Sequence, residues 1–408
     1  MKKIFITILL ICMTLFTGCT SIFNNEIYNK SYNVSIDLEE FEDLITATVE
    51  KTSPAVVGVS NYDVSLTGIS LASTGSGVIY DCKAIMKDGT VEKDYTKTFD
   101  SSEVEEYEYL VVTNRHVIYS KNTNIIKVVL DNGNKKIIAE VLGYDDKVDL
   151  AVVKFTYGGF IQPIEFANSD EIKSGNFAVA IGSPGGYDYF NSSTFGIISY
   201  PKRYMSDDTD GDGISDWDSE YIQHDVAINP GSSGGALVNI KGELIGINTL
   251  KLVDEEIDNM GFAIPSNLVK EIISYLEKGT TPKRYTLGIT VIEVIAIIEG
   301  DTNLKNVEIP EGITSGLYVS EVDIFGKAFR KLQVGDIILE INNVPIIKTQ
   351  EFRAELGKVL AGEDVILKVI RGEEELEVKI RIWKKALVYW NGKMLVDIKK
   401  STNVFILL

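Results

Sequence analysis

Short runs of β-branched and aromatic residues recur between Val56 and Leu250, and they constrain the fold more than any other feature of the chain. Gly, Asn and Asp residues separate these runs, as turns separate short strands. Many short strands with such turns predict an all-β barrel or a pair of packed sheets. The runs expected to form strands are Ala55–Val59, Ser76–Tyr80, Tyr109–Thr113, Ile125–Leu130, Leu150–Phe155, Ala178–Ile181 and Glu243–Asn248.

Two helices and two polar stretches complete this region. Apolar residues at helical spacing, with acidic residues in the first half, predict a helix over Asp37–Lys51. A second helix is expected over Pro265–Leu276, and Pro282 just beyond it marks a domain boundary. The charged stretches Asp81–Glu108 and Tyr200–Glu220 lack strand periodicity, so we expect long surface loops there.

The first residues have the layout of an export signal. Lys2 and Lys3 precede an apolar run, Ile4–Phe16, which is too short to match a bilayer. Thr17-Gly18-Cys19 follows the run and resembles a bacterial lipoprotein cleavage box, although Phe16 stands where that box usually has Leu. We therefore expect a signal peptide at 1–18 and a lipid on Cys19, with an uncleaved anchor or plain secretion as the alternatives.

The net charge and the cysteine content bear on the partners of the protein and on whether it forms disulfides. The formal net charge of −19 repels phosphate backbones and argues against nucleic acid partners. The only cysteines are Cys12, Cys19 and Cys82, so loss of the first and lipidation of the second would leave Cys82 without a partner in the chain. The sequence therefore predicts an exported protein that folds without disulfides.

A glycine-rich serine segment points to nucleophilic catalysis. Serine needs a histidine base, an acid that orients the base, and amide donors for the developing oxyanion. Asn229-Pro-Gly-Ser-Ser-Gly-Gly places Ser233 among glycines that permit the close backbone approach and unusual dihedral angles of a nucleophile loop, where the amides of Gly231 and Ser233 would bind the oxyanion. His116 and Asp149 each adjoin an apolar strand upstream, which gives the chain order His, Asp, Ser.

Together these segments resemble the HtrA family of serine proteases, which join a chymotrypsin-like double β-barrel to a PDZ domain. Further segments agree in the family's order over about residues 40 to 384: Val49-Glu-Lys-Thr-Ser-Pro-Ala-Val-Val57, Gly75-Ser-Gly-Val78, Ser193-Thr-Phe-Gly-Ile-Ile-Ser199 and Gly261-Phe-Ala-Ile-Pro-Ser-Asn267. The resemblance implies a mainly β fold, the triad His116, Asp149 and Ser233, and no cofactor for catalysis. It also implies a homotrimer held by residues ahead of the first barrel, where Phe23, Tyr28 and Tyr32 are available.

Other residues compete for the base and acid roles. His224 is the only other histidine, but it lies on the strand leading into the serine loop, where a general base is badly placed and the family more usually has Thr. The competing acids are Asp145, Asp146 and Asp225. Only Asp149 directly precedes the expected strand.

The resemblance also addresses specificity. Ala227 stands six residues before Ser233, where a trypsin-like pocket has its aspartate, so cleavage after Lys or Arg should be disfavoured. An aliphatic preference is implied, with Ile228 and Leu250 as candidate pocket walls, although both could simply be core residues. Ser232 replaces the acid that pairs with a new amino terminus in digestive relatives, so that activation route is absent.

A second β-rich unit begins after residue 282. Tyr285-Thr-Leu-Gly-Ile289 resembles the carboxylate-binding loop of PDZ domains, and Gly316–Val322 with Val334–Asn343 resembles their most recognisable stretch. The amides of Leu287, Gly288 and Ile289 would receive the terminal carboxylate of a peptide that adds a strand to the sheet. Phe352, Leu356 and Val359 lie at helical spacing and could line the side-chain pocket or the core.

These boundaries divide the chain into five parts. They are a signal peptide at 1–18, a leader with the first helix at 19–52, a protease domain at 53–280, a PDZ domain at 283–384 and an extension of unknown role at 385–408.

The acidic segment 208–216 suggests a calcium site. Oxygen ligands at alternate positions with glycine at the turn follow the spacing of an EF-hand loop. The twelfth position is Ser219, so Asp218 or Glu220 would have to close the site, and a solvated acidic loop is the alternative. The candidate ligands are Asp208, Asp210, Asp212, Asp216 and the carbonyl of Ile214.

The sequence therefore predicts an ATP-independent serine endopeptidase of the cell envelope. It would degrade unfolded or damaged proteins, bind free carboxyl termini at the PDZ domain and attach to the membrane through lipid. The alternative is a chaperone-like or scaffolding protein with secondary proteolysis or none, and the intact triad favours the enzyme.

Overall fold

The computed structural model describes residues 37–94, 101–130, 133–184, 189–209, 215, 217–249, 259–300, 302, 307–360, 362–382, 387–390 and 393–396. The chain divides into two compact units, Met1–Leu44 and Ile45–Leu408. In the first unit the structure describes only the start of α2 (Leu38–Thr52) and the residue before it. The expected helix over Asp37–Lys51 is thus confirmed to within one residue at each end.

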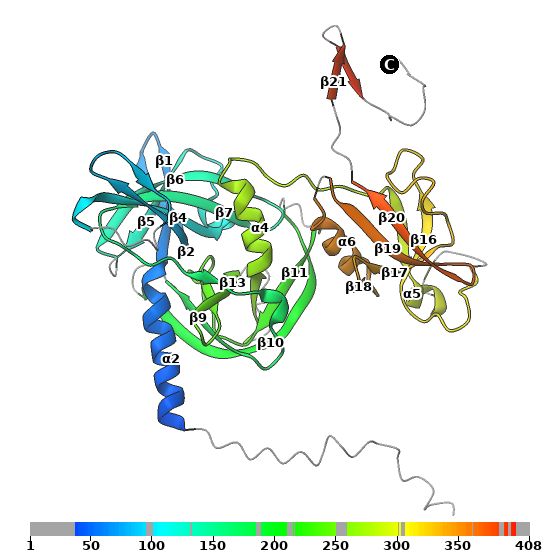
Figure 1. Ribbon diagram of the computed structural model, residues 1–408, viewed down its shortest axis with the longest axis horizontal. Coiled ribbons are helices and arrows are strands. Elements are labelled where there is room, and N and C mark those ends of the chain that lie inside the picture. The colour runs from blue at the N-terminus through cyan, green and yellow to red at the C-terminus, as the bar shows by residue number, and fades with distance from the viewer. Residues whose placement is uncertain are drawn as a thin grey trace, which may run out of the picture. The chain divides into compact units, whose positions relative to one another are not determined.

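The first seven strands of the second unit form an antiparallel sheet that closes into a barrel. The strand order is β1-β5-β6-β7-β4-β2-β3, and an additional pairing of β1 with β2 closes the ring, which leaves β3 at its edge (Figure 1). The strands are β1 (Val56–Ser65), β2 (Gly68–Met86), β3 (Val91–Glu92), β4 (Val104–Asn114), β5 (Asn124–Leu130), β6 (Lys135–Asp145) and β7 (Leu150–Tyr157).

The next seven strands repeat this design. Their order is β12-β9-β10-β11-β14-β13-β8, and pairing of β12 with β13 closes a second ring, with β8 added in parallel beside β13. The strands are β8 (Glu165–Phe166), β9 (Phe177–Gly182), β10 (Ser192–Asp207), β11 (Trp217–His224), β12 (Ala236–Val238), β13 (Glu243–Thr249) and β14 (Gly261–Pro265).

Short helices connect and flank the two barrels. The helix α4 confirms the second helix expected from sequence, and its buried face, which includes Val269 and Ile273, packs on the barrel core. The remaining elements here are α3 (Arg115–Ile118), α4 (Ser266–Leu276), η1 (Ser53–Ala55), η2 (Ser101–Glu103) and η3 (Ser169–Glu171).

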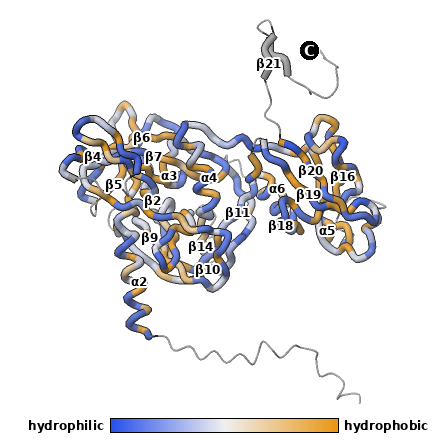
Figure 2. Tube along the Cα trace, viewed as in Figure 1, coloured by the Kyte–Doolittle hydropathy of each residue, from blue (hydrophilic) through white to orange (hydrophobic). Residues whose placement is uncertain are grey.

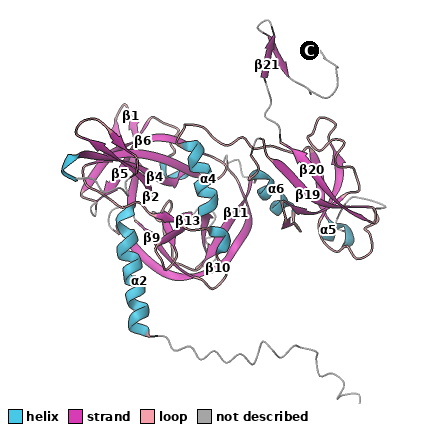
Figure 3. Cartoon of the chain, in the orientation of Figure 1, coloured by secondary structure: helices cyan, strands magenta, loops and turns pink. Residues whose placement is uncertain are grey.

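A third sheet follows α4. It has the order β15-β16-β17-β19-β20, with β18 paired to β17, so β15 is an edge strand. Strands outnumber helices in this part as in the barrels (Figure 3). The elements are β15 (Ile289–Glu293), α5 (Val294–Ile298), β16 (Leu317–Val322), β17 (Ile337–Ile341), β18 (Val344–Pro345), α6 (Thr349–Gly357), β19 (Asp364–Arg371) and β20 (Glu374–Arg381), and a separate hairpin comprises β21 (Leu387–Trp390) and β22 (Lys393–Val396).

Valine, isoleucine and leucine make up most of the buried core. Burying each such side chain contributes about 1.5 to 3 kcal/mol relative to leaving it exposed. Val111, Val112 and Val152 are fully buried on adjacent strands of the first barrel. Hydrophobic and hydrophilic residues intermix along the strands and along α2 (Figure 2). Cys82 is a buried free thiol, and its burial raises the pKa of that thiol to about 12.

Six of the seven strands expected from sequence lie within observed strands. The seventh, Ala55–Val59, lies in β1 except for Ala55, which ends η1. The two expected surface loops, however, are wrong. Within Asp81–Glu108, β2 continues to Met86 and β4 begins at Val104, and Lys83 forms an ion pair with Glu108 at 3.3 Å across the two strands. Within Tyr200–Glu220, β10 continues to Asp207 and β11 begins at Trp217. The described parts of both stretches are therefore paired strands. Charged residues on β2 and β4 are half-buried or exposed, whereas Asp218 and Glu220 on β11 are buried and paired with Arg353 and Lys358.

No helix in the part of the chain that the structure describes is long and apolar enough to cross a membrane. The proposed signal peptide and Cys19 lie outside the described residues.

Candidate active site

His116 lies at the point where a buried strand becomes a single helical turn. The strand β4 ends at Asn114, and α3 begins at the next residue. The Asn114 side chain donates from Nδ2 to the backbone oxygen of Asp149 at 3.0 Å, and the amide of Arg115 donates to the same oxygen at 3.1 Å. These two bonds hold the His116 segment against the residue that precedes β7.

Both carboxylate oxygens of Asp149 bind His116. Oδ2 lies 2.6 Å from His116 Nδ1, and Oδ1 accepts the His116 backbone amide at 2.9 Å. The Asp149 side chain is 6% exposed and the His116 side chain 36% exposed, so the acid is shielded while the imidazole remains open to solvent. With a proton on Nδ1 facing the carboxylate, Nε2 is left as the basic nitrogen.

Asp149 has an unusual backbone conformation. Its φ is +54°, in the left-handed region that few residues other than glycine adopt. Such conformations cost about 1 to 3 kcal/mol and persist where surrounding contacts impose them. The two hydrogen bonds between the Asp149 carboxylate and His116 are contacts of that kind, as are the two hydrogen bonds to the Asp149 carbonyl.

A tight turn precedes Ser233. The Ser232 amide donates to the Asn229 carbonyl at 2.8 Å, with Pro230 and Gly231 at the two central positions. Gly231 has a φ of +102°, as the third residue of a type II turn requires, which explains a glycine there. The turn places the amides of Gly231 and Ser233 on a short, fixed stretch of backbone.

The serine loop packs against the strands that carry the rest of the site. The Ser76 amide of β2 donates to the Ser233 carbonyl at 2.8 Å. A Cβ atom on Gly234 would lie 2.2 Å from the Ser76 carbonyl and 2.4 Å from Thr113 Oγ1, so only glycine fits. A Cβ atom on Gly75 would lie 2.6 Å from Val117 and 2.9 Å from the Ser233 carbonyl. The serine loop and Val117, the residue after His116, are thus both neighbours of Gly75.

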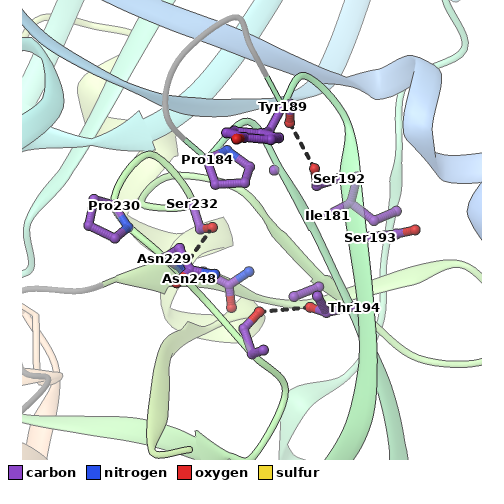
Figure 4. A pocket seen from close by; sticks show the side chains of 13 residues that line it. Ile181, Pro184, Tyr189, Ser192, Ser193, Thr194, Asn229, Pro230, Ser232 and Asn248 are labelled. Atoms are coloured by element: carbon purple, nitrogen blue, oxygen red, sulfur yellow. Dashed lines mark hydrogen bonds between the residues drawn. The ribbon is translucent and has the colours of Figure 1, made fainter. Parts of the chain in front are cut away.

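A pocket of about 650 Å³ adjoins the serine turn (Figure 4). Of the three residues expected to shape specificity, Ala227 lines this pocket, Ile228 packs against the core of the second barrel, and Leu250 lies outside the described residues. Thr194 donates from Oγ1 to the Ala227 carbonyl at 2.8 Å. The pocket is lined by Ala180, Ile181, Gly182, Pro184, Tyr189, Ser192, Ser193, Thr194, Ala227, Asn229, Pro230, Ser232 and Asn248.

His224, the competing base, is fully buried on β11. Within the described residues neither ring nitrogen has a hydrogen-bond partner, and burial lowers the pKa of the imidazole to about 4. Polar groups near the ring partly counteract the lowering of the pKa, but none of them forms a hydrogen bond with it. They are the backbone of Val226 and Phe262 and the side chain of Asn248. Ser233 is not among these neighbours.

The competing acids are engaged elsewhere. Asp145 is buried and forms an ion pair with Arg284 at 2.8 Å, while its other oxygen accepts the Lys147 amide. Asp146 pairs with Arg115 at 2.7 Å. Asp225 accepts the amide of Ile197 at 2.7 Å. Among the four candidate acids, only Asp149 is hydrogen-bonded to His116.

The expected carboxylate-binding loop lies at the start of the edge strand β15. Leu287 is buried, Gly288 has a φ of +73°, and Ile289 begins β15. The Ala328 amide donates to the Leu287 carbonyl at 3.0 Å, which fixes the loop from behind. Phe352, Leu356 and Val359 are buried in the core of this domain, in agreement with the core alternative.

Most of the proposed calcium ligands cannot be placed. Asp208 is described, whereas Asp210, Asp212, Ile214 and Asp216 lie outside the described residues. The candidate closing residues, Asp218 and Glu220, are buried on β11 and paired with Arg353 and Lys358. No group of three or more His, Cys, Asp or Glu side chains suited to a metal occurs in the described part of the chain.

Two residues that contact the site, Asn114 and Ser76, were not predicted from the sequence. Asn114 bridges the base and acid segments, and its position directly before the helical turn, as a short polar residue, was a usable signal. The side chain of Ser76 contacts the serine turn, and its place between two glycines was the only hint.

Comparisons with known proteins agree with this geometry. The trypsin-like peptidase domain model matches residues 99–247, and the PDZ domain model matches residues 285–382. The Serine protease Do-like HtrA of Lactococcus lactis subsp. cremoris is 31% identical over 358 residues, which cover 82% of this chain and 79% of that protein. The chain belongs to the HtrA family of serine proteases. The Bacillus subtilis HtrA is 30% identical, over 84% of this chain and 73% of the relative.

Solved HtrA structures share the fold. The HtrA-type protease AlgW with a decapeptide has a TM-score of 0.56 and 26% identity, over 83% of this chain and 98% of that chain. The mainly β fold, a chymotrypsin-like protease followed by a PDZ domain, is thereby confirmed, and this HtrA protein is a serine protease.

Proposed function

We propose that this HtrA protein is an ATP-independent endopeptidase that degrades unfolded or damaged proteins outside the cytoplasm, with His116, Asp149 and Ser233 as its triad. The observation that carries the proposal is the 2.6 Å contact between His116 Nδ1 and the buried Asp149 carboxylate, beside a glycine-rich serine loop. The relative from Salmonella typhimurium is named a periplasmic endoprotease, which supports the location.

In this mechanism His116 Nε2 removes the proton from Ser233 Oγ, which attacks the scissile carbonyl carbon. The amides of Gly231 and Ser233 bind the oxyanion of the tetrahedral intermediate. His116 then returns the proton to the leaving amine, and the C–N bond breaks to leave an acyl-enzyme. Water, deprotonated by His116, hydrolyses the ester, while Asp149 stabilises the imidazolium at each stage.

The specificity proposal rests on the neutral pocket beside the serine turn. Ala227 contributes a methyl group, and none of the described residues that line the pocket is charged. Nothing there would compensate the charge of a buried Lys or Arg side chain, which is costly to desolvate. We therefore propose a preference for small aliphatic residues before the cleaved bond.

The PDZ domain is proposed to regulate the protease through α6. Trp217 of β11 packs against Gly357, where a Cβ atom would lie 2.9 Å from the indole ring. Arg353 forms an ion pair with the buried Asp218 at 2.7 Å, and Tyr204 donates to Glu355 at 2.7 Å. Because α6 also fills the PDZ core, a peptide that displaces it would disturb these contacts with β10 and β11.

A lipid on Cys19 and a homotrimer remain proposals from the sequence, as does calcium in the segment 208–216. Mass spectrometry of the mature amino terminus tests the first, and an unmodified terminus at another residue would reject it. Saturating peptides with free apolar carboxyl termini test regulation, and an unchanged hydrolysis rate with proven binding would leave only a tethering role.

The central experiment is degradation of casein by the purified protein and by Ser233→Ala. We expect the wild type to degrade unfolded casein without ATP and the variant to be inactive but equally stable. Equal behaviour of both proteins, with casein bound and intact, would instead favour a chaperone-like binding protein.

A further inference from the structure

Ser76 on β2 is fully buried, and every one of its polar atoms is hydrogen-bonded around the serine loop. Its amide donates to the Ser233 carbonyl at 2.8 Å, and its carbonyl accepts from Thr113 Oγ1 at 2.6 Å. Its hydroxyl donates to the Gly231 carbonyl at 2.7 Å and accepts from the Ser183 amide at 2.8 Å. One residue therefore joins the nucleophile loop to the end of β4 and the end of β9.

The contact to Gly231 fixes one peptide plane of the turn. The plane between Gly231 and Ser232 is held at its oxygen by Ser76 Oγ and at its nitrogen by the Asn229 carbonyl. With that plane fixed, the direction of the Gly231 N–H depends only on the φ and ψ of Gly231, and the φ is +102°. Among the described residues this N–H has no protein acceptor, so it is available to a ligand.

Removing the Ser76 hydroxyl would change the conformation of the turn before Ser233. The Gly231 carbonyl and the Ser183 amide would both lose their partner in a buried site, at a cost of about 1 to 3 kcal/mol for each unsatisfied group. Rotation of the Gly231–Ser232 plane offers the carbonyl other partners, because glycine tolerates a wide range of dihedral angles. Such a rotation would also break the bond from the Ser232 amide to the Asn229 carbonyl that closes the turn, so the neighbouring Pro230–Gly231 plane, which carries the Gly231 N–H, would no longer be held toward the oxyanion.

We propose that Ser76 is a positioning residue for catalysis: its hydroxyl holds the turn so that the Gly231 and Ser233 amides converge on the oxyanion. The proposal rests on the triad and oxyanion assignment above. Ser76 does not touch the substrate. It acts through the backbone of Gly231 on one side of the turn and of Ser233 on the other.

A matched control separates this role from simple packing. Ser266 is also fully buried, and its hydroxyl donates to a backbone carbonyl, that of Ala167, at 2.9 Å. It lies at the start of α4 and is not hydrogen-bonded to the serine loop. Ser266→Ala therefore removes the same kind of bond from the same protein without affecting the turn.

The experiment measures kcat, KM, melting temperature and the inhibition constant of a peptide boronic acid, whose tetrahedral adduct mimics the oxyanion intermediate. Loss of an oxyanion donor costs about 10²- to 10³-fold in kcat, so misplacing one should cost about 10- to 100-fold. For Ser76→Ala we expect that loss in kcat, a KM within about two-fold and an inhibition constant weakened in parallel. For Ser266→Ala we expect a comparable drop in melting temperature and an unchanged kcat.

Should Ser76→Ala fail to fold, Ser76→Cys keeps a weaker donor and is expected to show a smaller loss in kcat with the same parallel change in inhibition. A kcat for the folded Ser76 variant equal to that of Ser266→Ala overturns the proposal. A wild type no more active than Ser233→Ala would instead reject the proposed function itself, so the two failures are distinguishable.

Discussion

The two histidines of this protein lie in opposite environments. His116 is partly exposed, and its Nδ1 faces a buried carboxylate at 2.6 Å. His224 is fully buried, has no hydrogen-bond partner for either nitrogen within the described residues, and has a pKa lowered to about 4 by desolvation. The same side chain is thus arranged for proton transfer in one place and kept neutral in the other.

The difference shows that partners rather than residue type decide the role. A base must accept a proton at neutral pH, and the Asp149 carboxylate stabilises that charge on His116. The Asp225 carboxylate and nearby dipoles favour the charged form of His224, but burial outweighs them. We expect substitution of His116 to change the rate of hydrolysis and substitution of His224 to change the stability of the fold.

The largest expected effect is on hydrolysis. We expect His116→Ala to lower kcat/KM by about 10⁴-fold or more, because the loss of any triad member removes activation of the serine. The matched variant His224→Thr, measured on the same peptide at pH 7.5, is expected to stay within about three-fold of the wild type. Comparable losses in both variants would erase the distinction between the two sites.

A smaller effect is expected on acid stability. The unfolded imidazole has a pKa near 6.5 and the folded His224 a pKa of about 4, so only the unfolded state gains the proton between these values. Above about pH 6.5, protonation of His224 therefore does not affect the free energy of unfolding. As the pH falls to about 4, the free energy of unfolding decreases by about 3 kcal/mol.

Urea unfolding at several pH values measures this loss. His224→Thr should show a flatter decline than the wild type between pH 6.5 and 4. Parallel curves for the wild type and His224→Thr would mean that the folded His224 takes up a proton as readily as the unfolded imidazole.

The smallest expected effect is that of calcium on the melting temperature, through the acidic segment 208–216. With a Kd of about 10⁻⁴ to 10⁻³ M, calcium at about 5 mM should stabilise the fold by about 1 to 2 kcal/mol and raise the melting temperature by a few degrees. The double variant Asp210→Ala/Asp212→Ala should not respond. Equal melting temperatures with calcium and with chelator in the wild type would rule out the site at that concentration.

The sequence was most informative where local pattern and burial coincide. Runs such as Leu150–Phe155 became strands because β-branched residues favour the pleated, buried environment of a closed barrel. The hairpin arms within Asp81–Glu108 and Tyr200–Glu220 were missed because their charged residues are stabilised across the hairpin or by α6. Lys83 with Glu108 is one case, and Asp218 with Arg353 is another.

For the site, residue order along the chain singled out His116 and Asp149, whose side chains lie in contact in the structure. It could not have shown that Ser76 binds Gly231 and Ser183, because those contacts join residues more than 100 positions apart. It also could not have fixed the left-handed backbone of Asp149, which depends on tertiary contacts with Asn114 and His116.

The central claim is that His116, held by Asp149, activates Ser233. The most direct measurement is labelling by a fluorophosphonate probe at pH 7.5, with the adduct mapped by mass spectrometry in the wild type, His116→Ala and His224→Thr. We expect one adduct on Ser233 in the wild type and in His224→Thr, and almost none in His116→Ala. An adduct on another residue, or labelling that persists without His116 and disappears without His224, would contradict it.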